Sequence, residues 1–271
     1  MTTKSQQDSD LLSLIQNQKI DEHLASLRYA GLIQNALMPE NEFLKGLFKN
    51  FFVLFLPRDI VSGDFYYSIS NGRYFCIAAG DCTGHGVPGA LLSILGISFL
   101  NEIILSKSNL RANRILNMMR EKVMKALHQT GTKSETKDSI DIGLCIIEKE
   151  THEMQYSGAN RPLLLMRNGK LTEFRADKMT IGLGPLTEQP FTNITIETKP
   201  GDSFYLFSDG FSDQFGGIKD KKFKYKNFKR VIESIAGLPM YGQKDYLENT
   251  FFEWKGKTQQ VDDVLVFGFQ L

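Results

Sequence analysis

The chain has little cysteine and no long hydrophobic run. Only three cysteines occur in its 271 residues, Cys76, Cys82 and Cys145, and none lies in a paired spacing. Neither a disulfide framework nor a zinc ribbon is therefore indicated, and we expect a reducing, cytoplasmic environment. The longest unbroken apolar run, 51–56, has six residues, whereas a membrane helix needs about 20. The polar N-terminus has no hydrophobic signal region. We therefore expect no membrane span.

The chain also lacks an excess of charge of either sign. It contains 32 Lys and Arg against 31 Asp and Glu, so the formal net charge is +1. Proteins that bind the phosphate backbone of nucleic acids normally carry a basic excess, so we expect no nucleic acid partner. The hydrophobic fraction of 42% is sufficient for a sizeable core. No repeat and no tract of Pro, Gly or Ser divides the chain after residue 50, which favours one domain there.

The N-terminal part of the chain has a helical pattern of its own. Ile20, Leu24 and Leu27 follow three-and-four spacing until a proline ends the pattern. We predict an amphipathic helix within residues 1–40, followed by one domain over 41–271. Two interpretations stay open. The helix packs on its own domain, or it forms a homodimer or carries a regulatory signal into the domain.

From residue 50 onward, predicted strands and helices come in blocks. Asn71-Gly72 and Asn168-Gly169 each lie between strand-like runs, and each pair predicts a β-hairpin. Hairpins, in place of regular strand–helix–strand units, favour an α+β fold with antiparallel sheets. Helices are predicted at 89–105, 110–128, 226–236 and 243–254.

The first predicted hairpin brings two aspartates together. With Asn71 and Gly72 as a two-residue loop, the numbers of paired residues sum to 143, so Asp64 faces Ala79. Asp64 and Asp81 are then diagonal neighbours on one face, roughly 7–8 Å apart at Cα. Two carboxylates at that separation can bracket metal ions between them.

Further aspartates lie at predicted strand ends. Asp209 follows the apolar run 203–208, and Asp262 and Asp263 precede the last predicted strand. Each of them alone is more often a turn residue. In combination, oxygen ligands without a cluster of His or Cys favour Mg²⁺ or Mn²⁺ over zinc.

Several other polar residues are candidates for the same site. His85 is a candidate proton donor to a leaving serine oxygen, or it belongs to a helix-entry turn. Arg58 and Arg161 are candidate phosphate contacts, and the alternative for each is an ordinary surface arginine. Asp138 and Asp141 are candidate ligands of a third, weaker metal ion.

A lysine-rich segment follows the Asp209 motif. Residues 219–230 hold six Lys and one Arg but a single Asp. One interpretation is a solvated helix entry. The other is a flap that docks an acidic phosphoprotein beside the metal ions.

Five segments of the chain form an ordered set of motifs. They are VSGDFY at 61–66, GDCTGHGVPGALLS at 80–93, SGANRPLLL at 157–165, LFSDGFSDQFGG at 206–217 and QVDDVLV at 260–266. In order and spacing they resemble the stage II sporulation protein E-like serine phosphatases. That group is the bacterial branch of the metal-dependent PPM (protein phosphatase 2C-type) superfamily. The resemblance covers about residues 40–271.

The resemblance implies an α-β-β-α sandwich of two antiparallel sheets flanked by helices and preceded by an N-terminal helix. It also implies two Mn²⁺ or Mg²⁺ ions at one end of the sheets, with Asp64 and Asp81 as catalytic residues and Asp81 bridging both ions. Asp263 is a further candidate ligand, because a one-residue shift from its neighbour stays open. The metal ligands carried over by motif are Asp64, Asp81, the backbone carbonyl of Cys82, Asp209 and Asp262.

The activity implied by the resemblance is hydrolysis of phosphoserine or phosphothreonine by a water that bridges the two ions. The implied partner is a phosphorylated protein of the anti-sigma-factor antagonist type in a partner-switching pathway, with the N-terminal helix as regulatory input. The alternative from another class is a catalytically silent or resting signalling and binding module of the same fold. The near-neutral charge disfavours a two-metal phosphodiesterase or nuclease.

Overall fold

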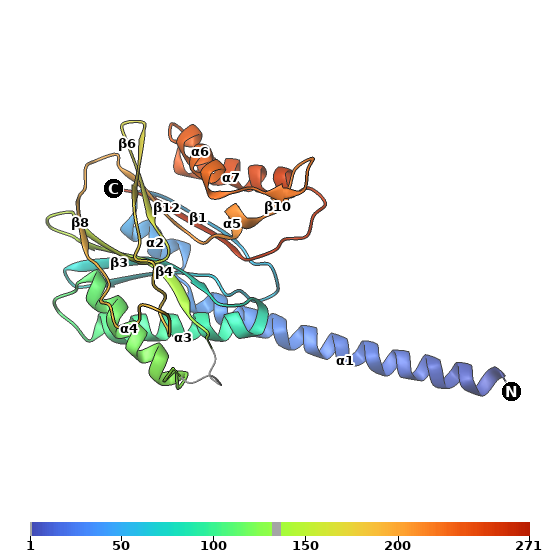
Figure 1. Ribbon diagram of the computed structural model, residues 1–271. Coiled ribbons are helices and arrows are strands. Elements are labelled where there is room, and N and C mark those ends of the chain that lie inside the picture. Colours follow the sequence, from blue (N-terminus) through green and yellow to red (C-terminus); the bar gives the residue numbers. More distant parts are fainter. Residues whose placement is uncertain (1, 132–136) are drawn as a thin grey trace.

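A computed structural model describes residues 2–131 and 137–271, with side chains described from residue 15 onward. Two five-stranded antiparallel sheets lie face to face, and helices cover their outer faces (Figure 1). The predicted α+β class and the α-β-β-α order of layers are confirmed. A predicted polar loop at 132–139 falls largely on residues outside the described ranges.

The first sheet has the strand order β1-β12-β9-β6-β7 and the second has the order β2-β3-β4-β5-β8. The strands of the first sheet are β1 (Asn50–Leu56), β12 (Val264–Gln270), β9 (Ser203–Phe207), β6 (Leu163–Arg167) and β7 (Lys170–Phe174). The strands of the second sheet are β2 (Phe65–Asn71), β3 (Tyr74–Cys82), β4 (Ile140–Glu148), β5 (Glu153–Ala159) and β8 (Ile194–Glu197).

Helices form the two outer layers. The second sheet is covered by α3 (Gly86–Leu105) and α4 (Ala112–Ala126), and the first sheet by α6 (Tyr225–Ile235) and α7 (Met240–Lys255). Four predicted helices are therefore present within a few residues of their predicted ends. The sequence pattern did not predict β8 or the short elements, which are α2 (Asn41–Leu47), α5 (Gly210–Asp213), β10 (Phe215–Gly216) and β11 (Lys221–Lys222).

Strand β9 shows how the layers are held together. Successive side chains of a strand point to opposite faces. Phe204 and Leu206 accordingly pack in the core between the two sheets, and Tyr205 and Phe207 pack under α6 and α7. Because helices cover the outer face as well, the strand is buried on both sides and reads as a continuous apolar run in the sequence.

The first hairpin differs in register from the prediction. Asn71 pairs with Tyr74, so Gly72 and Arg73 form the loop, and the positive φ of Gly72 (51°) fits the first position of a type II′ turn. Asn71 stays in the strand because its side-chain amide donates to the carbonyl of Ile104, at 2.5 Å. The residue numbers of each pair between β2 and β3 therefore sum to 145 instead of the predicted 143, with Phe65 opposite Gly80. Continued by one residue, this register sets Asp64 directly across from Asp81 rather than diagonal to it. The second hairpin turns at Asn168-Gly169 as predicted.

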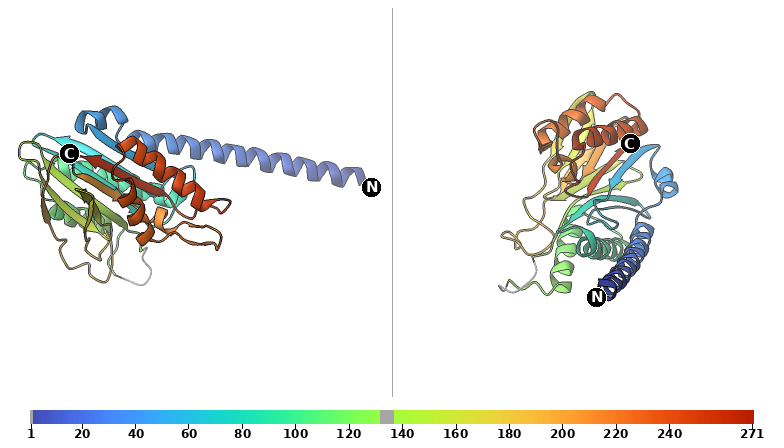
Figure 2. Two further views of the ribbon diagram at one scale, coloured as in Figure 1. Left: turned by 90° about the horizontal axis from the view of Figure 1, so that it is seen from above. Right: turned by 90° about the vertical axis from the view of Figure 1, so that its right-hand side faces the viewer.

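Helix α1 (Thr2–Leu37) is one continuous helix of 36 residues, about 54 Å long at 1.5 Å per residue. Most of it projects away from the sandwich (Figures 1 and 2). Gly31, Gln34 and Met38, at its C-terminal end, are the buried positions among its described side chains and the residue that follows it. Packing on the domain therefore accounts for the last turns only. Ile20, in the predicted apolar stripe, is 48% exposed.

Among the described residues, α3 is the one helix long and apolar enough to cross a membrane by length and composition. Half of its most apolar stretch is buried within the domain. Leu92, Ile97 and Leu100 on its buried side belong to the core under the second sheet. We therefore interpret α3 as a core helix of the sandwich.

Candidate metal centre

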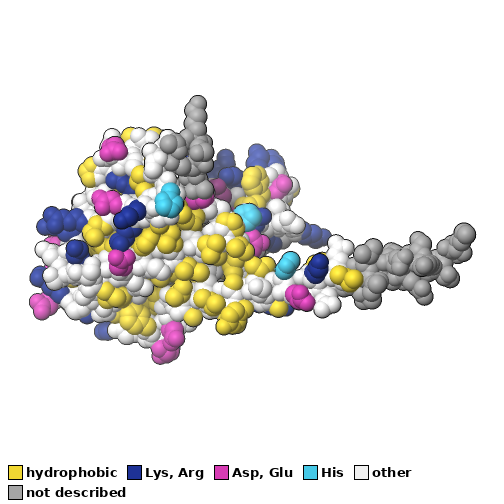
Figure 3. Space-filling view, turned by 90° about the horizontal axis from the view of Figure 1, so that it is seen from below, with side chains coloured by type: hydrophobic (Ala, Val, Ile, Leu, Met, Phe, Trp, Pro, Cys, Tyr) yellow, Lys and Arg dark blue, Asp and Glu magenta, His cyan; other side chains and the backbone are white. Residues whose placement is uncertain are grey.

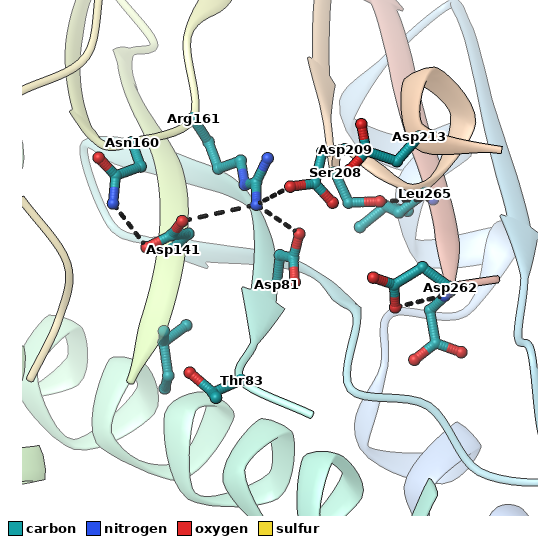
Figure 4. Close-up of polar contacts among 12 residues, drawn as sticks. Asp81, Thr83, Asp141, Asn160, Arg161, Ser208, Asp209, Asp213, Asp262 and Leu265 are labelled. Carbon is teal, nitrogen blue, oxygen red and sulfur yellow. Dashed lines mark hydrogen bonds and ion pairs between the residues drawn. The ribbon is translucent and has the colours of Figure 1, made fainter. Parts of the chain in front are cut away.

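Carboxylate side chains from both sheets converge at one end of the sandwich. Asp81 lies near the end of β3, and Asp141 lies opposite it near the start of β4. Asp209 follows β9, and Asp262 precedes β12 (Figure 4). These four aspartates line a cavity of about 200 Å³. Strand ends that are far apart in the sequence thus bring four acidic groups to one place.

Asp64 lies beside this cavity, immediately before β2, and is only 2% exposed. Its Oδ2 atom is buried and has no hydrogen-bond partner among the described residues. Burial, and next the charge of Asp81, raise the pKa of Asp64 well above its ordinary value. Burial also raises the pKa of Asp81 to about 7, although Arg161 opposes that shift. Both carboxyl groups lie where a neighbouring cation would stabilise the charged form.

Gly63 permits the close approach that places Asp64. A Cβ atom on Gly63 would lie 2.7 Å from the carbonyl oxygen of Gly84 and 3.3 Å from that of Cys82. Any side chain there would push the loop before β2 away from the end of β3. Cys82 itself is 5% exposed, and burial raises the pKa of its thiol. The thiol is therefore protonated, and the oxygen donor that Cys82 can present at this end of β3 is its backbone carbonyl.

The two adjacent aspartates before β12 have different surroundings. Asp263 is 2% exposed, and its two carboxylate oxygens accept hydrogen bonds from the backbone N–H groups of Arg58 and Gly63, both at 2.7 Å. Asp263 therefore holds the loop that carries Asp64. Asp262 lines the cavity instead, and burial raises its pKa.

Arg58 and His85 lie at the edge of this arrangement. Arg58 donates through Nη1 to the carbonyl of Val261, at 3.0 Å. His85 immediately precedes α3, with Nδ1 3.0 Å from Oδ2 of Asp59, and both side chains are about half exposed. In the described part of the chain, neither Arg58 nor His85 lines the 200 Å³ cavity. The charge of His85 still acts on Asp262, whose pKa it lowers against the effect of burial.

Arg161, which the sequence offers as a candidate phosphate contact or as a surface arginine, lies among these carboxylates. It lies after β5, and one of its nitrogens, Nη2, is 2.8 Å from Asp81, 2.8 Å from Asp209 and 3.5 Å from Asp141 (Figure 4). Only 14% of its side chain is exposed, so the surface interpretation is wrong. Burial lowers the pKa of Arg161, but the three carboxylates outweigh burial and raise it. The neighbouring Asn160 donates to Asp141 at 2.9 Å.

The groups available to bind a metal ion at this site are carboxylates and a backbone carbonyl, and such oxygen ligands suit hard divalent cations. A bound cation would also provide the partner that the buried Oδ2 of Asp64 lacks among the described residues. Within the described ranges, however, no three Cys, His, Asp or Glu side chains already converge to hold one ion. Instead, the guanidinium of Arg161 lies between Asp81 and Asp209. Asp138, the other candidate for a weaker third ion, does not line the cavity in the described structure, whereas Asp141 does.

Gln34, which belongs to none of the sequence motifs, connects α1 to the loop that carries Asp64. Its side-chain amide donates to the carbonyl of Ser62 at 2.5 Å and accepts from the N–H of Ser62 at 3.0 Å. It also donates to the hydroxyl of Ser93 in α3, at 2.7 Å. Gln34 is 3% exposed. The sequence signal for this role was that Gln34, although polar, lies at helical spacing from Gly31 and Met38 and therefore on the same face of the helix.

The lysine-rich segment lies next to α5. Lys222, in β11, forms an ion pair of 2.8 Å with Asp213 at the end of α5. The hydrogen bond to Asp213 raises the pKa of Lys222, and the charge of Asp209 adds to the effect. The turn between β10 and β11 exposes Ile218 completely. A basic hairpin thus lies within electrostatic reach of the acidic cavity.

Comparison with known proteins gives a consistent assignment of family and fold. The family model described as Stage II sporulation protein E (SpoIIE) matches residues 71–271. The SiaA-PP2C domain of Pseudomonas aeruginosa is 29% identical, with a TM-score of 0.83 over 93% of this chain and 98% of that domain. Among curated proteins, none matches the sequence significantly.

Two further solved structures share the fold at lower identity. The RsbU and RsbW domains of Rv1364c from Mycobacterium tuberculosis are 20% identical, with a TM-score of 0.62 over 82% of this chain and 60% of that chain. RsbX, whose structure contains magnesium, is 15% identical, with a TM-score of 0.53 over 82% of this chain and 94% of that chain.

Proposed function

The chain belongs to the stage II sporulation protein E (SpoIIE) family, and from that premise we propose that it hydrolyses phosphoserine or phosphothreonine in a protein substrate with the help of Mn²⁺ or Mg²⁺. The observation that carries the proposal is the convergence of Asp81, Asp209 and Asp262 around one cavity, with the unpartnered oxygen of Asp64 beside it. The fold is that of PPM phosphatases, which are metal-dependent as a family.

The residues that would hold two ions are Asp64, Asp81 and the carbonyl of Cys82 on one side, and Asp81, Asp209 and Asp262 on the other. When bound, such ions supply Lewis acidity, which activates water as a nucleophile and offsets the negative charge of the phosphate ester. RsbX, with the same fold, binds magnesium in its solved structure. Asp262 is preferred to Asp263 as a ligand because both oxygens of Asp263 already accept backbone hydrogen bonds.

The chain's own residues then position and protonate the substrate. In hydrolysis, the water oxygen bonds to phosphorus while the bond from phosphorus to the serine oxygen breaks, so the leaving oxygen needs a proton. His85 is the proposed donor, with Asp59 3.0 Å away to orient its ring. Arg58 and Arg161 are the proposed phosphate contacts, since a guanidinium matches the geometry of phosphate oxygens.

The test is hydrolysis of a phosphoserine peptide and of an aryl phosphate by the full chain. We expect turnover of both monoesters with Mn²⁺ or Mg²⁺ and none with EDTA. Preferential cleavage of phosphodiesters would contradict the proposal. Binding of a phosphoprotein without turnover in any divalent metal would favour the alternative, a catalytically silent or resting signalling module.

We propose that the basic hairpin docks the protein substrate. Lys219, Lys221, Lys222 and Lys224 are exposed, and the hairpin lies beside α5, which directly follows Asp209. A cluster of positive charge at this place complements an acidic surface around a phosphorylated serine. By family resemblance, the substrate would be a small protein of the anti-sigma-factor antagonist type in a cytoplasmic partner-switching pathway.

Charge reversal tests the docking proposal. The triple variant Lys221→Glu, Lys222→Glu and Lys224→Glu should raise the KM for a phosphoserine peptide with acidic flanks by about tenfold. Its KM for a small aryl phosphate should stay unchanged, because that substrate does not reach the hairpin. Equal effects on both substrates would count against docking. The matched control reverses three exposed lysines at the opposite end of the sandwich, Lys107, Lys170 and Lys199.

We propose that residues 1–40 act as a regulatory input to the domain at 41–271. Gln34 supports this, because its hydrogen bonds join α1 to Ser62, two residues before Asp64. A shift of α1 would therefore move Ser62, and with it Asp64, the proposed metal ligand two residues further along the chain. Gln34 lies in the last turn of α1, and the rest of this long helix projects away from the sandwich (Figure 2).

We further propose that α1 contributes to a homodimer. Tyr29 and Leu32 in α1 are 67% and 66% exposed, and Leu91 in α3 is 64% exposed. Hydrophobic side chains gather on the face that includes α3, from which α1 extends (Figure 3). In proteins, most of the stability of a helix comes from packing of its apolar face, and the domain itself provides that packing only for the last turns of α1. A second copy of α1 is the simplest partner for a helix of this length.

Light scattering, which measures molecular mass in solution, tests the proposed homodimer. We expect the mass of a dimer for the full chain and that of a monomer for Leu32→Glu, because a charge in a packed helix interface is strongly unfavourable. The control is His23→Glu, which places a charge at an exposed position on the side of the helix opposite Leu32. A monomeric full chain at micromolar concentration would refute the dimer.

A further inference from the structure

The guanidinium of Arg161 occupies a position among the carboxylates that a cation would be expected to take. Its Nη2 nitrogen lies 2.8 Å from one oxygen of Asp81 and 2.8 Å from one oxygen of Asp209. These side chains come from two different sheets, and both are proposed metal ligands. A third carboxylate, Asp141, lies 3.5 Å from the same nitrogen.

This arrangement leaves part of the guanidinium unsatisfied. The Nε atom of Arg161 is buried and has no hydrogen-bond partner among the described residues. A structural arginine normally uses several of its five donors, often in a bidentate pair. Here one nitrogen makes all three ion pairs. The contact is therefore governed by charge neutralisation more than by the geometry of the guanidinium.

Space for a second position of this side chain lies on its other side. A cavity of about 290 Å³ is lined by Pro162, Phe207 and Tyr225, and it shares Arg161 and Asp209 with the acidic cavity as walls. A guanidinium that leaves the carboxylates can therefore move into a neighbouring cavity without repacking the core.

We propose that Arg161 is an internal counter-cation of the acidic site, which neutralises Asp81 and Asp209 in the metal-free protein and is displaced toward the neighbouring cavity when a divalent cation binds. The inference rests on the proposed metal site. A monovalent side chain and a divalent ion compete for the same oxygens, so Arg161 weakens metal binding while it holds the ligands together. The displaced guanidinium then lies at the rim, beside the position of a phosphate.

Calorimetric titration of the full chain with Mn²⁺ tests the competition directly, without any measurement of turnover. Arg161→Met removes the charge and keeps the length of the side chain, and we expect it to bind Mn²⁺ at least about tenfold more tightly than the wild type. In EDTA the same variant should unfold at a lower temperature, because three carboxylates then lack their counter-charge. Arg161→Lys keeps the charge and should stay near the wild type in both measurements.

The outcomes separate this inference from the proposed function. If the wild type binds no Mn²⁺, the metal site itself is refuted. If the wild type binds Mn²⁺ and Arg161→Met binds it equally or more weakly, only the competition is refuted. Arg161→Gln provides the same comparison where the Met variant does not fold. Arg167→Met is the matched control, since the guanidinium of Arg167 pairs with Asp202 and does not line the acidic cavity in the described structure, so the affinity of this variant for Mn²⁺ should not rise.

Discussion

Asp81→Asn should lower kcat for a phosphoserine peptide by about 10³-fold or more, even in saturating Mn²⁺. Asp81 is the carboxylate that the two proposed ion positions share, and it lies across the hairpin from Asp64 in the register of β2 and β3. An amide has nearly the same shape, but it carries no charge and presents a single acceptor oxygen. Steady-state kinetics in Mn²⁺, with circular dichroism as a check of folding, measure the effect.

Asp245→Asn is the matched control, because Asp245 is an exposed aspartate of α7 on the outer face of the other sheet. Its kcat should equal that of the wild type. Retention of more than about a tenth of the turnover in Asp81→Asn would mean that Asp81 does not hold metal during the reaction. The water would then have to be activated by other groups.

Much of the site was predictable because strand ends and turns leave local signals in the sequence. Asp209 follows an apolar run that forms β9, and Asp262 precedes the run that forms β12. β9 and β12 are antiparallel neighbours in one sheet, so the end of β9 and the start of β12 lie at the same end of that sheet. The α+β class followed from the same pattern, because hairpins and blocks of helices leave few other layer arrangements.

The register of the first hairpin could not be predicted from local sequence signals. Asn-Gly is a strong turn signal, but the side chain of Asn71 is held by the carbonyl of Ile104 at the end of α3. That contact spans 33 positions of sequence, so no local pattern contains it. The loop moved by one residue, and Asp64 came opposite Asp81 instead of diagonal to it. A tertiary hydrogen bond therefore decided the relation between two proposed ligands.

The difference between Asp262 and Asp263 has a similar origin. The two residues are identical and adjacent, and only their partners distinguish them. The N–H of Gly63, 200 positions earlier in the chain, donates to Asp263. The three ion pairs of Arg161 likewise join segments that are distant in sequence. Sequence motifs could place these residues near the site, but they could not assign which carboxylate faces the cavity.

The pH dependence of stability is the second large effect that we expect. In the unfolded chain, the pKa of an aspartate is about 3.9. Burial raises the pKa of Asp81 to about 7 in the folded, metal-free protein. The folded state therefore binds a proton more tightly than the unfolded state. The resulting stabilisation is fully present below about pH 4 and is lost as the pH rises through about 7.

Asp81→Asn should remove this dependence, because the amide does not titrate. Relative to the wild type in EDTA, we expect the variant to gain up to about 4 kcal/mol in free energy of unfolding between pH 4 and pH 8. Urea titrations at several pH values measure the difference, and Asp245→Asn should follow the wild type throughout. A constant difference between Asp81→Asn and the wild type would show that Asp81 is charged at all these pH values.

Saturating Mn²⁺ should remove the difference in stability at pH 8. A ligand at 1,000 times its Kd adds about 4 kcal/mol to the folded state that binds it. That gain is available to the wild type and largely lost in Asp81→Asn, so it offsets the deficit that the wild type has in EDTA. Loss of the difference in Mn²⁺ requires Asp81 to be a metal ligand, because an aspartate with a purely structural role would leave Asp81→Asn equally far above the wild type in EDTA and in Mn²⁺.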